Sequence, residues 1–208
     1  MGKITLNGTP PTERVIPFDP TCAPFHKGQT VTTKFYQVGP GGALGDVFVY
    51  VKEGAKPTPP PAEPIVLDQL GCQYSPYIFG IHTGQKLIIK NSDPGILHNV
   101  HVVPDAKSGN TEYNQAQLKG QDLVKTFDKP EVLLHFKCDV HDWMHCYAGV
   151  LDHPYYCVSA KDGTYKIANL PPGKYVIEAY HRKAGKQTKE ITISDQNQTA
   201  DFTFEVPK

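Results

Sequence analysis

Three residues in the second half of the chain combine side chains that soft metal ions prefer. Cys138, His141 and Met144 follow one another at intervals of three residues, in a Cys-x2-His-x2-Met loop. A thiolate, an imidazole and a thioether so close together suit copper in both oxidation states better than they suit zinc or iron. His98, upstream of this loop, supplies a second imidazole. The spacing therefore predicts one copper ion held by these four side chains.

Each of these side chains has an ordinary explanation when it is taken singly. A lone cysteine or methionine is usually part of a core, and a lone histidine is usually a surface or satisfied side chain. Together, in this order and spacing, they are hard to explain as packing. A binuclear centre that also uses His145 and Cys146 is disfavoured, because Cys138 and Cys146 are too far apart in the chain to form a Cys-x3-Cys loop.

The ligands need a rigid frame, and the sequence predicts an all-β one. Short runs rich in Val, Ile, Thr, Tyr and Phe alternate with Gly- and Pro-containing turns, and no stretch keeps a long helical hydrophobic period. His98 lies at a loop-to-strand junction, and Cys138 follows a strand-like run. The predicted strands are 2–7, 46–52, 65–70, 78–82, 87–91, 99–103, 125–127, 132–137, 147–151, 164–168, 175–181, 190–193 and 201–206.

Composition divides the chain into domains. Residues 57–64 are rich in proline, cannot build a strand ladder, and are expected to form an extended linker. The closely spaced strands over residues 65–157 predict a compact sandwich. Residues 1–56 and 158–208 hold too few strands for separate cores, so we expect them to join in one discontinuous β-sandwich.

The charge balance and the termini narrow the class of protein. Lys+Arg and Asp+Glu both number 21, so no net charge favours nucleic acid or an anionic membrane surface. No apolar run approaches the roughly 18 residues of a transmembrane segment, and the N-terminus lacks the apolar core of a signal peptide. We expect a periplasmic or secreted protein whose signal peptide has been removed.

The five cysteines are an odd number, so one of them needs a role other than pairing in an exported protein. Cys138 takes that role as a metal ligand. Among the other four, the preferred disulfide joins Cys22 to Cys72, because each lies just outside a strand-like run. A bond between Cys146 and Cys157 is the weaker alternative, since both also fit the description of small buried side chains.

The ligand region resembles the cupredoxin family of blue copper proteins, in its amicyanin- and plastocyanin-like form. The likeness covers roughly residues 65–152, and it rests on the short ligand loop and on the His-Asn-Val-His string that begins at His98. It implies a Greek-key sandwich with a type 1 copper site. In such a site His98, Cys138 and His141 form a trigonal plane, and Met144 is the long axial ligand.

Four neighbours of the ligands bear on this resemblance. Asn99 is implied to lock the two ligand loops together. Leu97 and Asp142 stand where the resembled pattern carries proline. Trp143, the only tryptophan, lies beside the ligand that is expected to be nearest the surface. It either forms part of an apolar docking patch for a redox partner or packs over the site.

The flanking segments resemble another family. Residues 162–177, with their Asp-Gly and Pro-Pro-Gly turns, look like the carboxypeptidase regulatory-like, transthyretin-like β-sandwich, and residues 2–8 resemble its opening strand. The shared motif mostly encodes turns. That family is non-catalytic, so the resemblance implies a scaffold.

Taken together, the sequence predicts an electron-transfer protein rather than an enzyme. No Ser/His/Asp set, phosphate-binding glycine loop or paired-carboxylate motif stands out. The resemblance implies a one-electron carrier between extracytoplasmic redox partners, such as a cytochrome or a dehydrogenase. The alternatives are a copper storage or delivery protein and a small copper enzyme with an open coordination site, in which Met144 does not bind.

The carboxylates beside the ligands predict how the site is tuned. Asp139 and Asp142 bring negative charge close to the metal, which favours Cu(II) over Cu(I) and lowers the midpoint potential. Asp142→Asn is therefore expected to raise the midpoint potential, measured by redox titration of the copper-loaded protein. An unchanged or lower potential would count against this electrostatic argument.

Overall fold

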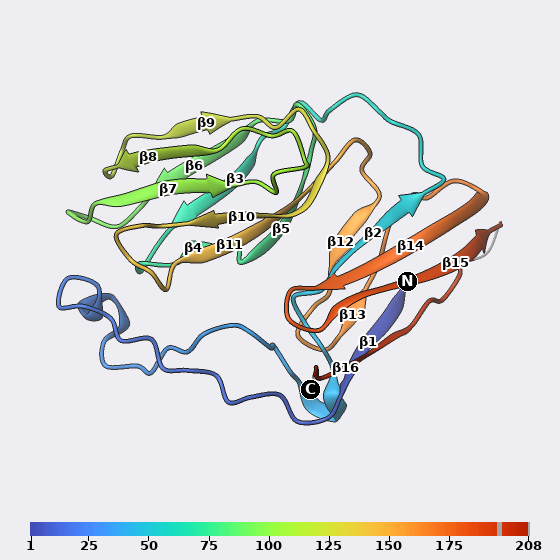
Figure 1. Ribbon diagram of the computed structural model, residues 1–208, viewed down its shortest axis with the longest axis horizontal. Helices are drawn as coiled ribbons and strands as arrows, with labels where there is room; N and C mark the ends of the chain where they lie inside the picture. Colours follow the sequence, from blue (N-terminus) through green and yellow to red (C-terminus); the bar gives the residue numbers. More distant parts are fainter. Residues whose placement is uncertain (195–196, 208) are drawn as a thin grey trace. The chain divides into compact units, whose positions relative to one another are not determined.

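The computed structural model describes residues 1–194 and 197–207, and it confirms the all-β prediction. The only helices in these residues are two short 3-10 turns, η1 (Ala23–His26) and η2 (Pro40–Gly42). Within the same residues, none of the helices has the length and apolar character needed to cross a membrane. The architecture therefore consists of short strands, arranged in four sheets (Figure 1).

The chain folds into two compact units, each built from separate segments. Unit 1 comprises Met1–Glu13, Lys34–Thr58 and His153–Lys208, and unit 2 comprises Arg14–Thr33 and Pro59–Asp152. The boundary near the prolines falls inside the expected linker, residues 57–64, which contain no strand.

One segment lies in a different unit from the expected one. Arg14–Thr33, which we call the strap, was expected to join the first sandwich with the rest of residues 1–56, but it belongs to unit 2. The reason is covalent, because Cys22 in the strap forms a disulfide with Cys72. Phe18 and Phe25 of the strap also pack against the core of unit 2.

The end of the central domain differs as well. Residues 153–157 were expected to close that domain, but they belong to unit 1. Tyr156 and Cys157 start β12 (Tyr156–Val158), which pairs antiparallel with β2 (Phe48–Glu53) of unit 1.

Unit 2 contains a two-sheet sandwich, whose strands are coloured from cyan through green to gold in Figure 1. The first sheet contains, in order, β5 (Ile78–His82), β11 (His145–Leu151), β10 (Glu131–Lys137), β7 (His98–Val103) and β8 (Tyr113–Gln117). The second contains β4 (Tyr74–Ser75), β3 (Ile65–Gln69), β6 (Leu87–Asn91) and β9 (Leu123–Lys125). Alternate residues of both sheets enter one apolar core. Leu134 and Phe136 on β10 are fully buried there, and each burial contributes about 1.5–3 kcal/mol.

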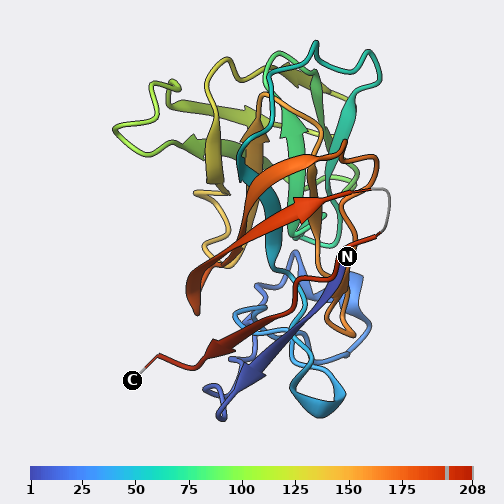
Figure 2. The ribbon, with the colours of Figure 1, turned by 90° about the vertical axis from the view of Figure 1, so that its right-hand side faces the viewer.

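Unit 1 contains two further sheets, in which strands of the N- and C-terminal segments pair with one another. One sheet has the order β13 (Thr164–Tyr165), β1 (Gly2–Asn7) and β16 (Phe202–Glu205), and β1 pairs parallel with β16. The other has the order β12, β2, β14 (Gly173–His181) and β15 (Gly185–Ile193). The long β14 and β15 run side by side in Figures 1 and 2. Residues from both sheets, such as Ile4 and Ile177, share one core.

The predicted Asp162-Gly163 turn shows why this position needs glycine. Gly163 has a φ of +77°, and a Cβ atom there would lie 2.3 Å from the backbone oxygen of Ile4. The N–H of Ile4 also bonds the oxygen of Gly163 at 2.8 Å. This close approach ties the turn to the first strand of the chain.

A buried histidine in unit 1 predicts that stability depends on pH. His181 is 2% exposed, and its Nδ1 accepts the backbone N–H of Ala184 at 3.0 Å. Burial, helped by the charge of Arg182, lowers the pKa of His181 to about 4. Because the unfolded chain has the ordinary value of about 6.5, it binds the proton more readily. Stability is therefore complete above pH 6.5 and falls as the pH drops towards 4, by at most about 3 kcal/mol.

Thermal unfolding of the full chain between pH 4 and 7.5 measures this dependence. The control is His181→Asn, which keeps an oxygen acceptor for the Ala184 N–H but does not titrate. This substitution should flatten the dependence of the unfolding temperature on pH between about pH 6.5 and about pH 4. An identical slope in the two proteins would show that another group is responsible.

Candidate metal centre

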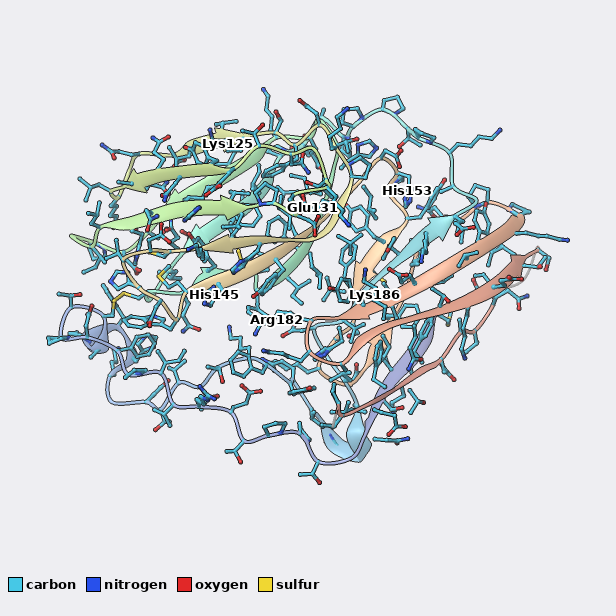
Figure 3. All side chains as sticks on the ribbon, in the orientation of Figure 1. Lys125, Glu131, His145, His153, Arg182 and Lys186 are labelled. Atoms are coloured by element: carbon cyan, nitrogen blue, oxygen red, sulfur yellow. A yellow bond between two sulfur atoms is a disulfide. The ribbon has the colours of Figure 1, made fainter. Side chains whose placement is uncertain are left out.

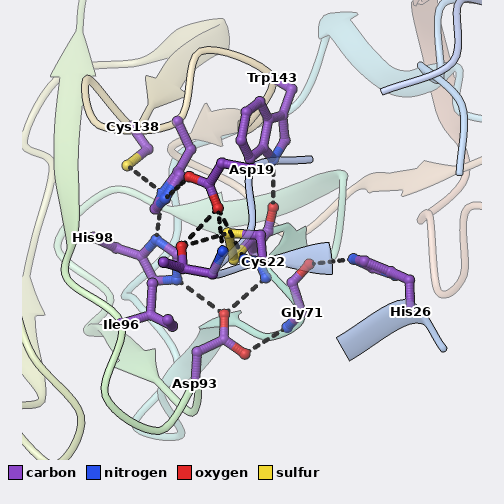
Figure 4. The surroundings of a disulfide bond; sticks show 12 residues. Asp19, Cys22, His26, Gly71, Asp93, Ile96, His98, Cys138 and Trp143 are labelled. Carbon is purple, nitrogen blue, oxygen red and sulfur yellow. Dashed lines mark hydrogen bonds and ion pairs between the residues drawn. A yellow bond between two sulfur atoms is a disulfide. The ribbon is translucent and has the colours of Figure 1, made fainter. Parts of the chain in front are cut away.

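Three of the four predicted ligands converge at one end of the five-stranded sheet of unit 2. The Nδ1 atoms of His98 and His141 are 3.0 Å apart, and the Sγ of Cys138 lies 3.7 Å from Nδ1 of His141. His98 and Cys138 are labelled in Figure 4. Ligand atoms of all three residues lie within 4.8 Å of one another. Their side chains are at most 3% exposed.

Strand periodicity explains why two of these side chains face inwards. On β10 the buried positions are Leu134 and Phe136, and Cys138 continues this alternation just past the end of the strand. On the neighbouring β7, His98 is on the same face as the buried Val100, whereas His101 is on the opposite face. The adjacent antiparallel strands thus bring a thiol and an imidazole to one end of the sheet.

Backbone hydrogen bonds tie Met144 to two of the other predicted ligands in a closed loop. The backbone N–H of Cys138 donates to the oxygen of Met144 at 3.1 Å, and the N–H of Met144 donates to the oxygen of His141 at 2.9 Å. Met144 is 1% exposed and belongs to the same core cluster as Cys138. The backbone therefore ties these three residues of the motif together.

Asn99 connects the two ligand-bearing segments. Its Oδ1 accepts the backbone N–H groups of Asp139 at 2.6 Å and Val140 at 3.3 Å. Its own N–H donates to the Sγ of Cys138 at 3.4 Å. These bonds join the start of β7 to the loop after β10, which is the contact that the resemblance implied.

A buried carboxylate determines the proton position on His98. Nε2 of His98 lies 2.9 Å from Oδ2 of Asp93, and both side chains are fully buried. Because a carboxylate only accepts hydrogen bonds, Nε2 carries the proton and Nδ1 presents its lone pair. Burial by itself would lower the pKa of His98, but its hydrogen bond to Asp93 and its interaction with Cys138 outweigh burial and raise the pKa. The surroundings of His98 therefore stabilise positive charge at its imidazole.

The surroundings of Cys138 and His141 also shift the pKa of each side chain towards the form that binds a metal ion. Burial would raise the pKa of Cys138, but its interaction with the side chain of His98 and the hydrogen bond from the backbone of Asn99 outweigh burial and lower the pKa. Burial, followed by the charge of His98, lowers the pKa of His141, which keeps its imidazole neutral. A thiolate and a neutral imidazole are the protonation states that a metal ion requires.

The donor set fits a soft or borderline metal ion. Ligand bonds of about 2.0 Å for nitrogen and about 2.3 Å for sulfur place the ligand atoms of one ion roughly 3–4 Å apart. The separations of 3.0 and 3.7 Å around His141 match this spacing. Two imidazoles and a thiolate, with a buried thioether in the same loop, suit copper.

The strap covers the edge of the site that sequence reasoning expected to be nearest the surface. Oδ2 of Asp19 lies 3.6 Å from Nε2 of His141, which is only 3% exposed. Phe18 packs edge-on against Trp143, with ring centroids 5.4 Å apart. The indole N–H of Trp143 donates to the oxygen of Cys72 at 3.0 Å. Trp143 therefore packs over the site.

The predicted Cys22–Cys72 disulfide is confirmed, and it lies beside the predicted ligand His141. Its two sulfur atoms and a nitrogen of His141 are all within 4.8 Å of one another. The alternative bond is not formed, since Cys146 and Cys157 are free and belong to different units.

The two acidic neighbours differ in how far their charge is balanced. Asp139 forms ion pairs with Lys137 at 2.9 Å and with His101 at 2.7 Å. The hydrogen bond from Lys137 is the main reason why the pKa of Asp139 is lowered far below its ordinary value. Asp142 is exposed. Its effect on the metal is therefore more strongly screened by water.

A second histidine pair lies apart from the three converging donors. His145 on β11 (labelled in Figure 3) accepts or donates a 2.9 Å hydrogen bond with His135, and the two rings stack. Among the described residues, neither histidine belongs to a group of three potential metal ligands. Burial raises the pKa of Cys146 well above its ordinary value, which keeps it a thiol. This arrangement does not favour the binuclear alternative.

Sequence reasoning missed Asp93 and Asp19. Both occur in turn-like segments next to proline, where aspartate commonly serves only the local backbone. Asp19 does cap its own turn, through the N–H groups of Thr21 and Cys22. The contact of Asp19 with His141 joins distant segments, so no local pattern could have revealed it. Asp93 is only five residues before His98, but no motif in the turn between them indicates that the carboxylate faces the imidazole.

The comparisons with known proteins found structural neighbours only. No protein-family model matches the chain, and no curated protein matches it. A copper-containing nitrite reductase from Thermus scotoductus SA-01 is 20% identical with a TM-score of 0.38, over 65% of this chain and 27% of that one. This chain thus spans about a quarter of the length of the reductase.

Two smaller proteins are also similar over part of the chain. Amicyanin from Paracoccus versutus is 20% identical with a TM-score of 0.38, over 49% of this chain and 96% of that one. A purple cupredoxin from Nitrosopumilus maritimus is 18% identical with a TM-score of 0.35, over 41% and 98%. Similarities with TM-scores below 0.5 do not indicate a function, so the function has to be inferred from the side-chain geometry.

The covering of His141 by the strap can be tested by removing the disulfide. Cys22→Ala/Cys72→Ala is expected to lower the free energy of unfolding by about 2–4 kcal/mol, because the bond closes a loop with a sequence separation of 50 residues. It should also speed carbethoxylation of His141, followed by peptide mass spectrometry. Cys157→Ala, which removes a free thiol from unit 1, is the control. Equal modification rates in all three proteins would mean that the strap does not shield His141.

Proposed function

We propose that the chain binds one copper ion through His98, Cys138, His141 and Met144 and acts as a one-electron carrier. The observation that supports this proposal is the position of three buried donor atoms. The Nδ1 atoms of His98 and His141 are 3.0 Å apart, and the Sγ of Cys138 lies 3.7 Å from Nδ1 of His141. Copper bound there supplies one-electron chemistry by alternating between Cu(I) and Cu(II). The site is proposed to be type 1, with Met144 as the axial ligand.

The residues around the ligands favour electron transfer because they hold the donors in place. Asp93 orients His98, Asn99 bonds the backbone after Cys138, and the closed loop fixes His141 relative to Met144. The three converging side chains are nearly inaccessible to water. A preorganised site of this kind needs little rearrangement when its charge changes.

The same burial speaks against the two alternatives. A storage or delivery protein needs ligands that another protein can reach, but His98, Cys138 and Met144 are 0–2% exposed. A small copper enzyme needs an open position for its substrate. Met144 is buried in the ligand loop, and the strap covers His141, so no observation favours such a position.

The electron partners and the location form part of the proposal. We infer that the chain exchanges electrons with redox proteins such as a cytochrome or a dehydrogenase, in the periplasm or after secretion. The Cys22–Cys72 disulfide supports an oxidising compartment, because such bonds persist there and are rare in the cytosol.

Unit 1 is proposed to be a non-catalytic scaffold of the carboxypeptidase regulatory-like, transthyretin-like type. This is supported by the parallel pairing of β1 with β16 and by the tight turn at Gly163, which together close a small sandwich from distant segments.

The visible spectrum of the copper-loaded protein tests the proposed ligation. The native chain is expected to bind one copper per chain and to show an intense thiolate-to-copper band near ~600 nm. Cys138→Ser should abolish this band, because serine supplies no thiolate. Cys157→Ser, which changes a free cysteine outside the site, should keep it. A Cys138→Ser protein that took up copper with unchanged colour would refute the thiolate assignment.

A further inference from the structure

A buried hydrogen bond links the predicted metal centre to the disulfide of the strap. Oδ2 of Asp93 lies 2.9 Å from Nε2 of His98, and neither side chain is exposed to solvent. The same oxygen accepts the backbone N–H of Cys72 at 2.7 Å. Asp93 therefore stands between a proposed copper ligand and the half-cystine at the base of the strap (Figure 4).

The carboxylate of Asp93 is held by more bonds than its contact with His98. Its Oδ1 accepts the N–H of Gly71 at 2.6 Å, and its own backbone N–H donates to Oδ1 of Asn91 at 3.0 Å. Gly71 and Cys72 both have positive φ, +63° and +52°, in a turn that points two successive N–H groups at one anion. A carboxylate fixed in this way cannot rotate to follow the imidazole.

This rigidity gives Asp93 control over His98. Both oxygen atoms of Asp93 accept hydrogen bonds from backbone N–H groups, and an ionised carboxylate has no proton to donate. The nitrogen of His98 that faces Asp93 must therefore be the one that carries the proton. The opposite nitrogen, Nδ1, then presents a lone pair towards His141 and Cys138. The imidazole has no room to exchange these roles while Asp93 remains ionised.

We infer that Asp93 is the positioning residue of the metal centre, which locks His98 in the Nε2–H tautomer and aims its Nδ1 lone pair at the ion. The effect of Asp93 on metal binding rests on the proposed copper function. The tautomer of His98 does not, because it is a property of the metal-free protein. A buried carboxylate hydrogen-bonded to a ligating histidine also increases the electron density that the imidazole offers to a metal.

The inference separates Asp93 from the exposed acid Asp142. A negative charge buried 2.9 Å from a ligand nitrogen is poorly screened, whereas solvent screens Asp142. Replacing Asp93 should therefore raise the midpoint potential more than replacing Asp142.

The first test is an NMR measurement of the metal-free, full-length native protein. Long-range ¹H–¹⁵N correlation of the imidazoles, at a pH where His98 is neutral, should show its proton on Nε2. This measurement needs neither copper nor a variant. A proton on Nδ1 of His98 would overturn the inference.

The second test compares Asp93→Asn with Asp68→Asn, using Cu(II) itself as the probe. An asparagine side chain has only one oxygen that accepts hydrogen bonds, whereas both oxygens of Asp93 accept them. Asp93→Asn should therefore change the NMR signal of the His98 tautomer and weaken Cu(II) binding by about 10- to 100-fold. Asp68 is a matched control: its carboxylate accepts the hydroxyl of Ser92, next to Asp93 in the chain, and contacts no proposed ligand. Asp68→Asn should leave both readouts as in the native protein.

The outcomes distinguish this inference from the proposed function. Cu(II) affinity within twofold of native and an unchanged tautomer in Asp93→Asn would overturn the positioning role. A native protein with the Nε2–H tautomer that binds no copper would instead refute the proposed function and leave the role of Asp93 intact.

Discussion

The centre depends on holding electron-rich atoms together against their mutual repulsion. Ligand atoms of His98, Cys138 and His141 lie within 4.8 Å of one another, and water is almost excluded from them. Without a counter-charge, such a cluster would be costly to bury. The surrounding bonds offset this cost, because Asp93 and Asn99 bind the outer sides of the donors and leave the inner sides for a cation.

The two sheets of unit 2 explain how such a cluster forms. β7, β10 and β11 are neighbours in one sheet, so their adjoining ends bring residues from separate parts of the chain together. The alternation of buried residues on β7 and β10 then turns His98 and Cys138 inwards. The copper proposal and the inference about Asp93 both build on this geometry, in which strand pairing sets the position of each donor and hydrogen bonds set its protonation.

Local patterns predicted the features that depend on neighbouring residues. The strands β5 and β6 were found with their observed bounds, and the spacing of the ligand loop together with His98 identified three converging donors. β8 was missed because its sequence, Tyr-Asn-Gln-Ala-Gln, is polar and mostly exposed. The position of the strap was missed for a different reason: its disulfide joins segments that are distant in sequence. Asp93 is close to His98 in sequence, but its carboxylate is oriented by the N–H groups of Gly71 and Cys72 from a distant turn, which no local pattern indicates.

The origin of the strap has a consequence for any attempt to isolate unit 2. A fragment that begins at Pro59 would carry all four proposed ligands, yet it would lack Cys22. Cys72 would then be a free thiol, and its sulfur lies within 4.8 Å of ligand nitrogens on both His98 and His141. Such a fragment would offer a metal ion two competing sulfur donors, so its binding properties would not represent those of the whole chain.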